Sequence, residues 1–366
     1  MLVPKLRFKE FNSEYQKYKI GDTLKVKSGK DQKSIECING TYPILGTGGQ
    51  IGTTNSFLYD KPSVLIGRKG TINKPQYMTA PFWTVDTLFY TDIKEEFNTK
   101  YIFYAFQNIN WKKYDESTGV PSLSCKTIEE ILYYIPNKDE QDKISTFITL
   151  LDKKIELQQR KIETLKIYKK GLVSHIFKNI SSTKKLKNIV TFQNGIGYEN
   201  LVDVTGNYNL ISLNSITIDG KLNKFMKKIK SDLPVSTLKK NDIVIIMSDV
   251  GHGDFLGVSA IIPDDNKYVL NQRVGLLRIT DNTIPQYLLY AINNLQSYFK
   301  KYGQGSSQLN LSKGDILNVN IPYIDIYSQK KLSDFFILFD KKISSANFKL
   351  ENLKSLRKSL LQQMFI

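Results

Sequence analysis

The sequence predicts an α+β protein in which two mixed α/β domains are separated by two long helices that pack as an antiparallel coiled coil. Three observations lead to this fold class. Much of the chain is repeated, each repeat ends in a long heptad pattern, and the segments before the helices contain short runs typical of strands. The repeat predicts pseudo-two-fold symmetry. The expected domains are residues 1–137 and 179–322, and the expected helices lie in residues 138–178 and 323–366.

The repeat is clearest in one tyrosine-containing segment of each half. Asn98–Asn108 resembles Ile284–Asn294 at an offset of 186 residues, with two tyrosines, an alanine and an asparagine in register. The same offset carries Leu123 toward Leu309. A period of this length indicates two copies of one structural unit. Toward the N-terminus the two copies resemble each other only in outline.

The offset between the two copies changes near their ends. Pro136 aligns with Pro322 at 186, whereas Asp152 in Asp-Lys-Lys-Ile aligns with Asp340 at 188. We therefore expect a two-residue insertion between Pro322 and Asp340.

Each repeat ends in a heptad pattern, in which apolar residues alternate at intervals of four and three. A cation, Lys169 or Arg357, lies at the corresponding position of each pattern. An apolar stripe of this length needs a partner, and the economical one is the other helix. The alternative is that each helix docks on its own domain. The predicted seam consists of Ile144, Ile148, Leu151, Ile155, Ile162, Leu165 and Leu172 in the first helix, and Leu332, Phe336, Phe339, Ile343, Leu350, Leu353 and Leu360 in the second.

The segments between the helices alternate β-branched or aromatic runs with Gly, Asn, Asp and Pro breaks. These runs predict strands at 63–67, 83–90, 242–247 and 274–279. The repeated tyrosine segments predict one helix in each domain, around 100–110 and 285–300. We therefore expect two irregular mixed domains of similar construction.

Composition favours a polyanionic partner. The chain has 52 Lys and Arg against 35 Asp and Glu, a formal charge of +17. This excess suits nucleic acid, although it also serves solubility. Two cysteines cannot form a disulfide framework, and no 18-residue uncharged apolar run predicts a membrane helix. Because the N-terminus also lacks an apolar signal region, we expect a cytoplasmic protein.

Candidate catalytic motifs have simpler interpretations. Gly46–Gly52 is glycine-rich but fits neither a dinucleotide fingerprint nor a P-loop, so we expect a turn. Pro263–Lys267 contains two aspartates, yet its Pro and Asn indicate a hairpin loop rather than a Mg²⁺ site. The chain has no Pro-Pro of an amino-methyltransferase, and His252 has no obvious catalytic neighbour. We therefore predict no catalytic residue and no metal site.

Three kinds of segment suit DNA binding instead. Gly67–Gly70 places Arg and Lys between glycines after a strand. Trp111–Gly119 and Tyr298–Ser306 are equivalent aromatic-Lys-Lys-Tyr segments that run into small polar loops, and Asn271–Arg273 offers side chains that suit purine edges. An ordinary basic turn remains an alternative for the first. The predicted DNA-binding residues are Arg68, Lys69, Lys112, Lys113, Ser117, Thr118, Asn271, Gln272, Arg273, Lys300, Lys301, Gln304 and Ser306.

Over essentially its whole length the chain resembles the specificity subunits of type I restriction–modification enzymes. The resemblance lies in the order and duplication of several segments, namely Val3–Phe8, Ile66–Ile72, Leu270–Arg273, the Ile-Pro pairs at 135–136 and 321–322, and the paired Asp-Lys-Lys-Ile helices. It implies two target-recognition domains, each reading half of a bipartite site on double-stranded DNA, with the helices as a spacer. It also implies assembly with two modification subunits and with restriction subunits, which would hold S-adenosylmethionine, ATP and Mg²⁺.

Two other functions remain open from the sequence. A single-chain restriction–modification enzyme would need its own methyltransferase or nuclease motif. A coiled-coil scaffold without a DNA role would show no dependence of DNA affinity on salt.

Overall fold

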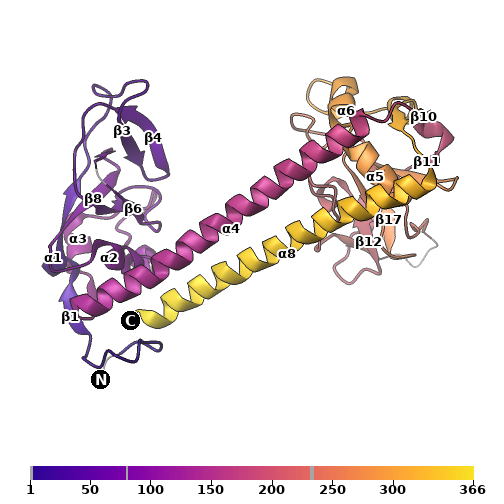
Figure 1. Cartoon of the computed structure of the whole chain (residues 1–366). Helices are drawn as coiled ribbons and strands as arrows, with labels where there is room; N and C mark the ends of the chain where they lie inside the picture. The colour runs from indigo at the N-terminus through magenta and orange to yellow at the C-terminus, as the bar shows by residue number, and fades with distance from the viewer. Residues whose placement is uncertain (1–2, 80, 231–234) are drawn as a thin grey trace. The chain divides into compact units, whose positions relative to one another are not determined.

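The computed structural model describes residues 3–79, 81–230 and 235–366. The chain forms two compact units, and each unit combines a globular part with portions of both long helices (Figure 1). Unit 1 contains Met1–Arg160 and Asn347–Ile366, and unit 2 contains Lys161–Ala346. Each unit therefore contains the beginning of one long helix and the end of the other.

Unit 1 has three antiparallel or mixed sheets with strand orders β2-β8-β5-β6, β4-β3-β7 and β1-β9. Its strands are β1 (Gln16–Lys19), β2 (Leu24–Ser28), β3 (Tyr42–Gly46), β4 (Gly49–Thr54), β5 (Ser63–Gly67), β6 (Gln76–Met78), β7 (Trp83–Thr84), β8 (Leu88–Ile93) and β9 (Leu132–Ile135). Its helices are α1 (Ile20–Thr23), α2 (Thr99–Phe106), η1 (Trp111–Tyr114), α3 (Cys125–Glu130), the first part of α4 (Lys138–Lys178) and the last part of α8 (Ile326–Met364).

Unit 2 has sheets with strand orders β11-β18-β14-β16, β13-β12-β17, β10-β20 and β15-β19. Its strands are β10 (Thr183–Lys185), β11 (Val190–Asn194), β12 (Tyr208–Ile211), β13 (Lys228–Ile229), β14 (Ile243–Ile246), β15 (Ser248–Asp249), β16 (Ser259–Ile261), β17 (Tyr268–Leu270), β18 (Val274–Ile279), β19 (Leu309–Asn310) and β20 (Asn320–Pro322). Its helices are the last part of α4, η2 (Leu186–Asn188), η3 (Glu199–Leu201), η4 (Leu213–Ser215), α5 (Pro285–Asn293), α6 (Gln296–Tyr302), α7 (Lys313–Leu317) and the first part of α8 (Ile326–Met364).

The two units share one topology. In each, a four-stranded sheet has its first strand paired with the last long strand, and a three-stranded sheet contains one parallel pair, β3 with β7 or β12 with β17. In each, a two-stranded sheet joins the first and last strands. The predicted α+β class and internal repeat are therefore confirmed.

The front halves of the units match more closely than the sequence indicates. Gly29 follows β2, and a Cβ built on it would lie 2.0 Å from the carbonyl oxygen of Val85. Gly195 follows β11, and its Cβ would lie 1.9 Å from the carbonyl oxygen of Asn271. Only glycine allows so close a backbone approach. These contacts align the front halves at an offset of 166 residues.

The expected position of the two-residue insertion is wrong. Ser124 and Ser312 cap equivalent helices, α3 and α7, at an offset of 188. The backbone N–H of Leu123 donates to Arg68, and that of Leu311 donates to Met247. Leu311, not Leu309, is therefore the counterpart of Leu123.

The start of the long helices shows the same offset. The side-chain amide of Gln141 donates to the backbone carbonyl oxygen of Pro136, and the side-chain amide of Gln329 donates to that of Ile324. Pro136 therefore corresponds to Ile324 rather than Pro322. The insertion lies earlier, between Asn294 and Phe299, where the helix expected around 285–300 is broken into α5 and α6.

The long helices pack against each other within each unit. In unit 1, Ile144, Ile148 and Leu151 of α4 share a core with Leu360 and Met364 of α8, and the same core includes α2. In unit 2, the Phe177 ring of α4 lies 6.0 Å from the Phe336 ring of α8. The early part of one helix meets the late part of the other, so the pair is antiparallel. None of the predicted seam residues is exposed, and the seam also packs on the globular parts.

A polar layer interrupts the seam in each unit, at equivalent positions. In unit 1, Asp152 accepts from Tyr104 Oη at 3.0 Å and pairs with Arg357, whose Nη2 also donates to Gln107 Oε1 at 3.0 Å. In unit 2, Asp340 accepts from Tyr290 Oη at 2.5 Å.

The cation of the second layer comes from α4 instead of α8. Lys169 Nζ donates to Asp340 Oδ1 at 2.7 Å. Each layer therefore joins both long helices to one globular part.

Candidate nucleic-acid interface

In unit 1, two segments that carry predicted DNA-binding residues meet a third segment at one edge. The N–H of Arg68 donates to Thr87 O at 2.8 Å, and that of Gly70 donates to Pro121 O at 2.8 Å. These bonds place the Arg68–Lys69 turn beside the loop that contains Ser117 and Thr118. We call segments 67–70, 85–87 and 115–123 edge 1.

The two cations of the turn are held differently. Arg68 is half-buried, its guanidinium lies 6.0 Å from the centre of the Phe89 ring, and Nη1 donates weakly to Asp86 O at 3.4 Å. Lys69 is exposed. A stacked arginine presents its fork in a set direction, whereas an exposed lysine acts as a mobile point charge.

Acidic side chains shape the neighbouring loop. Asp115 Oδ1 accepts from Ser117 Oγ at 2.8 Å and from the backbone N–H groups of Ser117 and Ser122. These bonds, that from the Ser122 N–H above all, lower the pKa of Asp115. Because its hydroxyl already donates to Asp115, Ser117 is better suited to shaping the loop than to reading a base. Thr118 is exposed at the tip.

Unit 2 has an equivalent edge. The N–H of Met247 donates to Arg273 O at 3.1 Å, and the N–H of Leu311 donates to Met247 O at 2.8 Å. Gln304 and Asn310 close the loop by two reciprocal backbone bonds of 2.9 and 2.8 Å. We call segments 247–249, 271–273 and 303–311 edge 2. It brings Gln272, Arg273, Gln304 and Ser306 to one side of the unit, and all four are exposed.

Asn271 differs from its two neighbours. Its side chain is only 8% exposed, and Nδ2 donates to Glu199 Oε1 at 3.0 Å. Gln272 reaches the same oxygen more weakly, at 3.5 Å. The bond from Asn271 lowers the pKa of Glu199, and the positive charge of Arg273 adds to this effect. Asn271 therefore positions the edge, and Glu199 is an exposed acceptor on it that the sequence did not identify.

The predicted lysine pairs lie next to each edge. Trp111 and Phe299 are fully buried anchors, with the Trp111 ring 5.4 Å from that of Phe106 in an edge-to-face contact. The lysines after them, Lys112 and Lys113 in η1 and Lys300 and Lys301 in α6, are exposed. Lys300 Nζ is also 2.8 Å from Asp254 Oδ1. A buried aromatic residue thus fixes the backbone that presents each pair.

Equivalent positions of the two edges carry different side chains. The N–H of Arg68 donates to Thr87 O, and the equivalent N–H of Met247 donates to Arg273 O. Thr87 therefore corresponds to Arg273, and Asp86 corresponds to Gln272. At the offset of the front halves, Lys33 corresponds to Glu199. The two edges therefore share a backbone frame but differ in hydrogen-bonding chemistry.

Of the two segments interpreted as turns, the first contains a turn, whereas the hairpin loop predicted for the second is wrong. Thr47 and Gly48 form the turn of the hairpin between β3 and β4. Pro263–Lys267 connects β16 to β17, which lie in different sheets. Among residues 3–79, 81–230 and 235–366, no group of three or more His, Cys, Asp or Glu is arranged to hold a metal ion. Over the same ranges, no helix combines the length and apolarity needed to cross a bilayer.

Comparison with known proteins identifies one family in both halves of the chain. The sequence profile of the family described as "Type I restriction modification DNA specificity domain" matches residues 12–167 and again residues 181–355. The chain is 22% identical over 290 residues to the type I restriction enzyme MjaVIII specificity subunit of Methanocaldococcus jannaschii, which is 71% of this chain and 68% of that protein.

Solved structures share the fold. The S subunit of a type I restriction–modification system from M. genitalium is 18% identical, with a TM-score of 0.65 over 100% of this chain and 99% of that chain. A chain from a study of complex assembly and conformational transition in the type I R-M system is 10% identical, with a TM-score of 0.63 over 97% and 98% of the two chains.

Proposed function

Because this chain belongs to the family of type I restriction modification DNA specificity domains, we propose that each of its units reads one half of a bipartite, asymmetric DNA site. The observation that carries the proposal is the pair of edges. They have the same backbone frame, exposed cations beside them, and different side chains at equivalent positions. A repeated frame suits two half-sites, and different side chains suit half-sites of different sequence.

The two kinds of side chain have different roles on DNA. Exposed lysines, such as Lys112 and Lys113, contact phosphates and supply affinity that falls with salt. Arg68 on edge 1 and the exposed Gln272 and Arg273 on edge 2 contact base edges and supply specificity.

The paired helices set the number of base pairs between the half-sites. Deleting one heptad from each helix, at the facing segments 157–163 and 346–352, removes about 10 Å of helix at 1.5 Å per residue. That length corresponds to about three base pairs. The expected result is a shorter spacer between unchanged half-sites. Altered half-sites with an unchanged spacer would contradict this assignment.

The outer faces of the helices dock the modification subunits. Phe147 and Leu150 on α4 are exposed, and so are their counterparts at an offset of 188, Phe335 and Leu338 on α8. Exposed apolar groups at equivalent positions suit two copies of one partner. We assign methyl transfer from S-adenosylmethionine to these two subunits, and ATP- and Mg²⁺-dependent cleavage to restriction subunits in the cytoplasm.

The proposal is tested by methylation mapping. The chain is co-expressed with its modification subunit, and methylated positions in the genomic DNA are sequenced. We expect one bipartite, asymmetric motif with a constant spacer, and no methylation when the modification subunit is omitted. Methylation by this chain alone would indicate a single-chain enzyme, and DNA affinity without salt dependence would indicate a scaffold.

A further inference from the structure

Two loops of equal length lead into the three-stranded sheets, one in each unit. We call residues 29–41 loop A and residues 195–207 loop B. Each begins at the glycine described above, Gly29 or Gly195, and ends near a second glycine. A Cβ on Gly40 would lie 2.4 Å from Thr54 N, and one on Gly206 would lie 2.4 Å from the carbonyl carbon of Ile229. The loops are therefore held at the same two points.

Each loop carries an almost fully exposed aliphatic side chain at the same position. Ile38 in loop A is 94% exposed, and Val204 in loop B is 93% exposed. The backbone just before each is fixed in the same way, since Cys37 N donates to Thr53 O at 2.9 Å and Asp203 N donates to Lys228 O at 3.0 Å. A single exposed aliphatic residue is ordinary, but two at equivalent positions of held loops indicate a shared partner.

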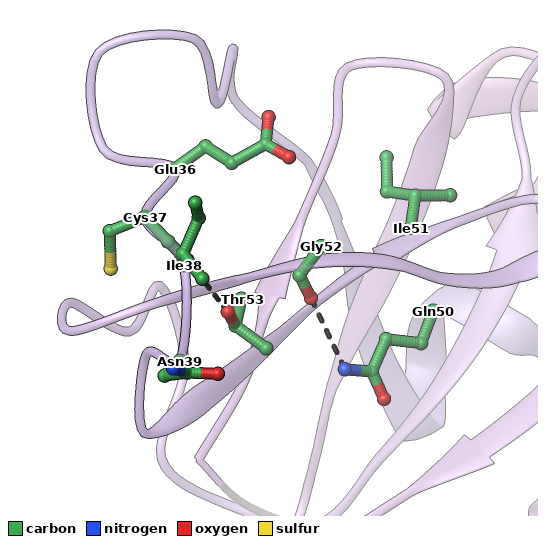
Figure 2. A pocket seen from close by; sticks show the side chains of 8 residues that line it. All are labelled: Glu36, Cys37, Ile38, Asn39, Gln50, Ile51, Gly52 and Thr53. Atoms are coloured by element: carbon green, nitrogen blue, oxygen red, sulfur yellow. Dashed lines mark hydrogen bonds between the residues drawn. The ribbon is translucent and has the colours of Figure 1, made fainter.

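Loop A borders a surface hollow of about 830 Å³. Figure 2 shows Glu36 to Asn39 on one side of it and Gln50 to Thr53 of β4 on the other. Ile38 and the half-exposed Ile51 supply apolar surface, and the lining also contains the amide side chains of Asn39 and Gln50. Gln50 Nε2 donates to Gly52 O at 3.2 Å, which holds this amide in place. Apolar groups beside amides match the mixed surface of a base edge.

Both loops continue directly from the DNA-reading edges. Lys30 N donates to Thr84 O at 2.9 Å, next to segment 85–87 of edge 1. Ile196 N donates to Leu270 O at 3.0 Å, next to segment 271–273 of edge 2.

The charges of the loops argue against a phosphate-binding role. Loop A carries two lysines and two acids, and loop B carries Glu199 and Asp203 with no cation. A loop without excess positive charge at a DNA-facing edge is suited to bases, while the neighbouring lysines hold the backbone.

We propose that Ile38 and Val204 are specificity-determining residues, each making apolar contact with the 5-methyl group of a thymine in the major groove of its own half-site. The proposal rests on the proposed function, because it assumes that the edges read DNA. It requires an A·T pair in each half-site. It assigns Ile38 to one half-site and Val204 to the other.

The test uses the complex of the full chain with its modification subunits. Once the wild-type motif has been mapped, each thymine of the half-sites is replaced by uracil, which removes only the methyl group. We expect one position in each half-site at which the wild-type complex loses about fourfold in affinity, the value of one buried methyl group. In the Ile38→Ala complex the uracil penalty should disappear in one half-site only, and in the Val204→Ala complex in the other only.

Because both side chains are almost fully exposed, replacing them with alanine should not disturb folding, so a folding defect would not explain a lost uracil penalty. Phe225 is a matched control, since it is 94% exposed and lies outside both loops. Phe225→Ala should leave all uracil penalties unchanged. A half-site without thymine, or uracil penalties that persist in both variants, would overturn the inference while leaving the bipartite motif intact. Absence of any bipartite motif in the wild type would instead refute the proposed function.

Discussion

Removal of Asp152 should destabilise unit 1 through the polar layer between the long helices. Asp152 contacts both Arg357 and Tyr104, and the side chains of Asp152 and Arg357 are 34% and 25% exposed. Exposed ion pairs contribute about 0.2–1 kcal/mol, whereas removing one partner of a fully buried pair costs about 3–5 kcal/mol. With exposure between these limits, Asp152→Ala should cost about 1–3 kcal/mol.

A double-mutant cycle separates the pair from the individual side chains. The free energy of unfolding in urea is measured for Asp152→Ala, Arg357→Ala and the double variant, with the helical signal followed by circular dichroism. We expect a coupling energy of about 1–2 kcal/mol, because the guanidinium makes two bonds to the carboxylate. A coupling energy below about 0.3 kcal/mol would refute the role of this layer in holding the helices together.

An exposed pair on the same helix supplies the control. Arg160 Nη2 lies 2.5 Å from Glu156 Oε1, but the two side chains are 72% and 56% exposed. Glu156→Ala should therefore change the unfolding free energy by less than about 0.5 kcal/mol. If Glu156→Ala lowers the unfolding free energy as much as Asp152→Ala does, loss of a charge on the helix would explain both effects. The contact between the two helices would then not be the cause.

Three further predictions concern the globular parts. The bond from Lys27 lowers the pKa of Asp92 below its ordinary value, so this ion pair stabilises the fold above about pH 4, and its contribution disappears as pH falls. Asp92→Asn should therefore flatten the acid side of a stability–pH profile; an unchanged slope would contradict this. The double variant Lys112→Ala/Lys113→Ala should reduce the salt slope of DNA affinity by about 0.9 for each phosphate that is no longer neutralised, measured by titration at several salt concentrations. An unchanged slope would place these lysines away from DNA. Gly195→Ala should cost about 1–3 kcal/mol in urea unfolding, because the added carbon collides with a carbonyl oxygen; a neutral effect would mean that the loop shifts freely.

The long helices could be predicted closely from the sequence. A heptad pattern specifies a helix, its buried stripe and the kind of partner it needs, and α4 begins at Lys138 as the pattern indicates. The polar layers could be seen only as interruptions of that pattern. That Asp152 pairs with Arg357, and Lys169 with Asp340, depends on the antiparallel register, which brings residues far apart in sequence together.

The equivalence of loops A and B could not be seen in the sequence, because it lies in the backbone. Gly29 and Gly195 are two of 22 glycines, and nothing beside them marks their close contacts. The displaced insertion has a related cause. Two prolines aligned by identity, whereas equivalent bonds from Gln141 and Gln329 show that Pro136 corresponds to Ile324. Identity of a single residue is weak evidence of equivalence when the backbone partner is not known.

Burial explains the remaining differences at the candidate site. Asn271, Gln272 and Arg273 are adjacent and all polar, yet only the last two face solvent. The buried Asn271 bonds to Glu199, 72 residues earlier in the chain. A linear motif gives the inventory of polar groups, and the fold decides which of them a ligand can reach.

The glycine contacts at the ends of loops A and B separate what each unit must conserve from what it can change. Gly29 and Gly40 keep loop A anchored whatever lies between them, and Gly195 and Gly206 do the same for loop B. Side chains that point into solvent, such as Ile38 and Val204, can be exchanged without disturbing these contacts. Such a division lets a new sequence preference arise by a few substitutions, while the framework that assembles with other proteins is inherited intact.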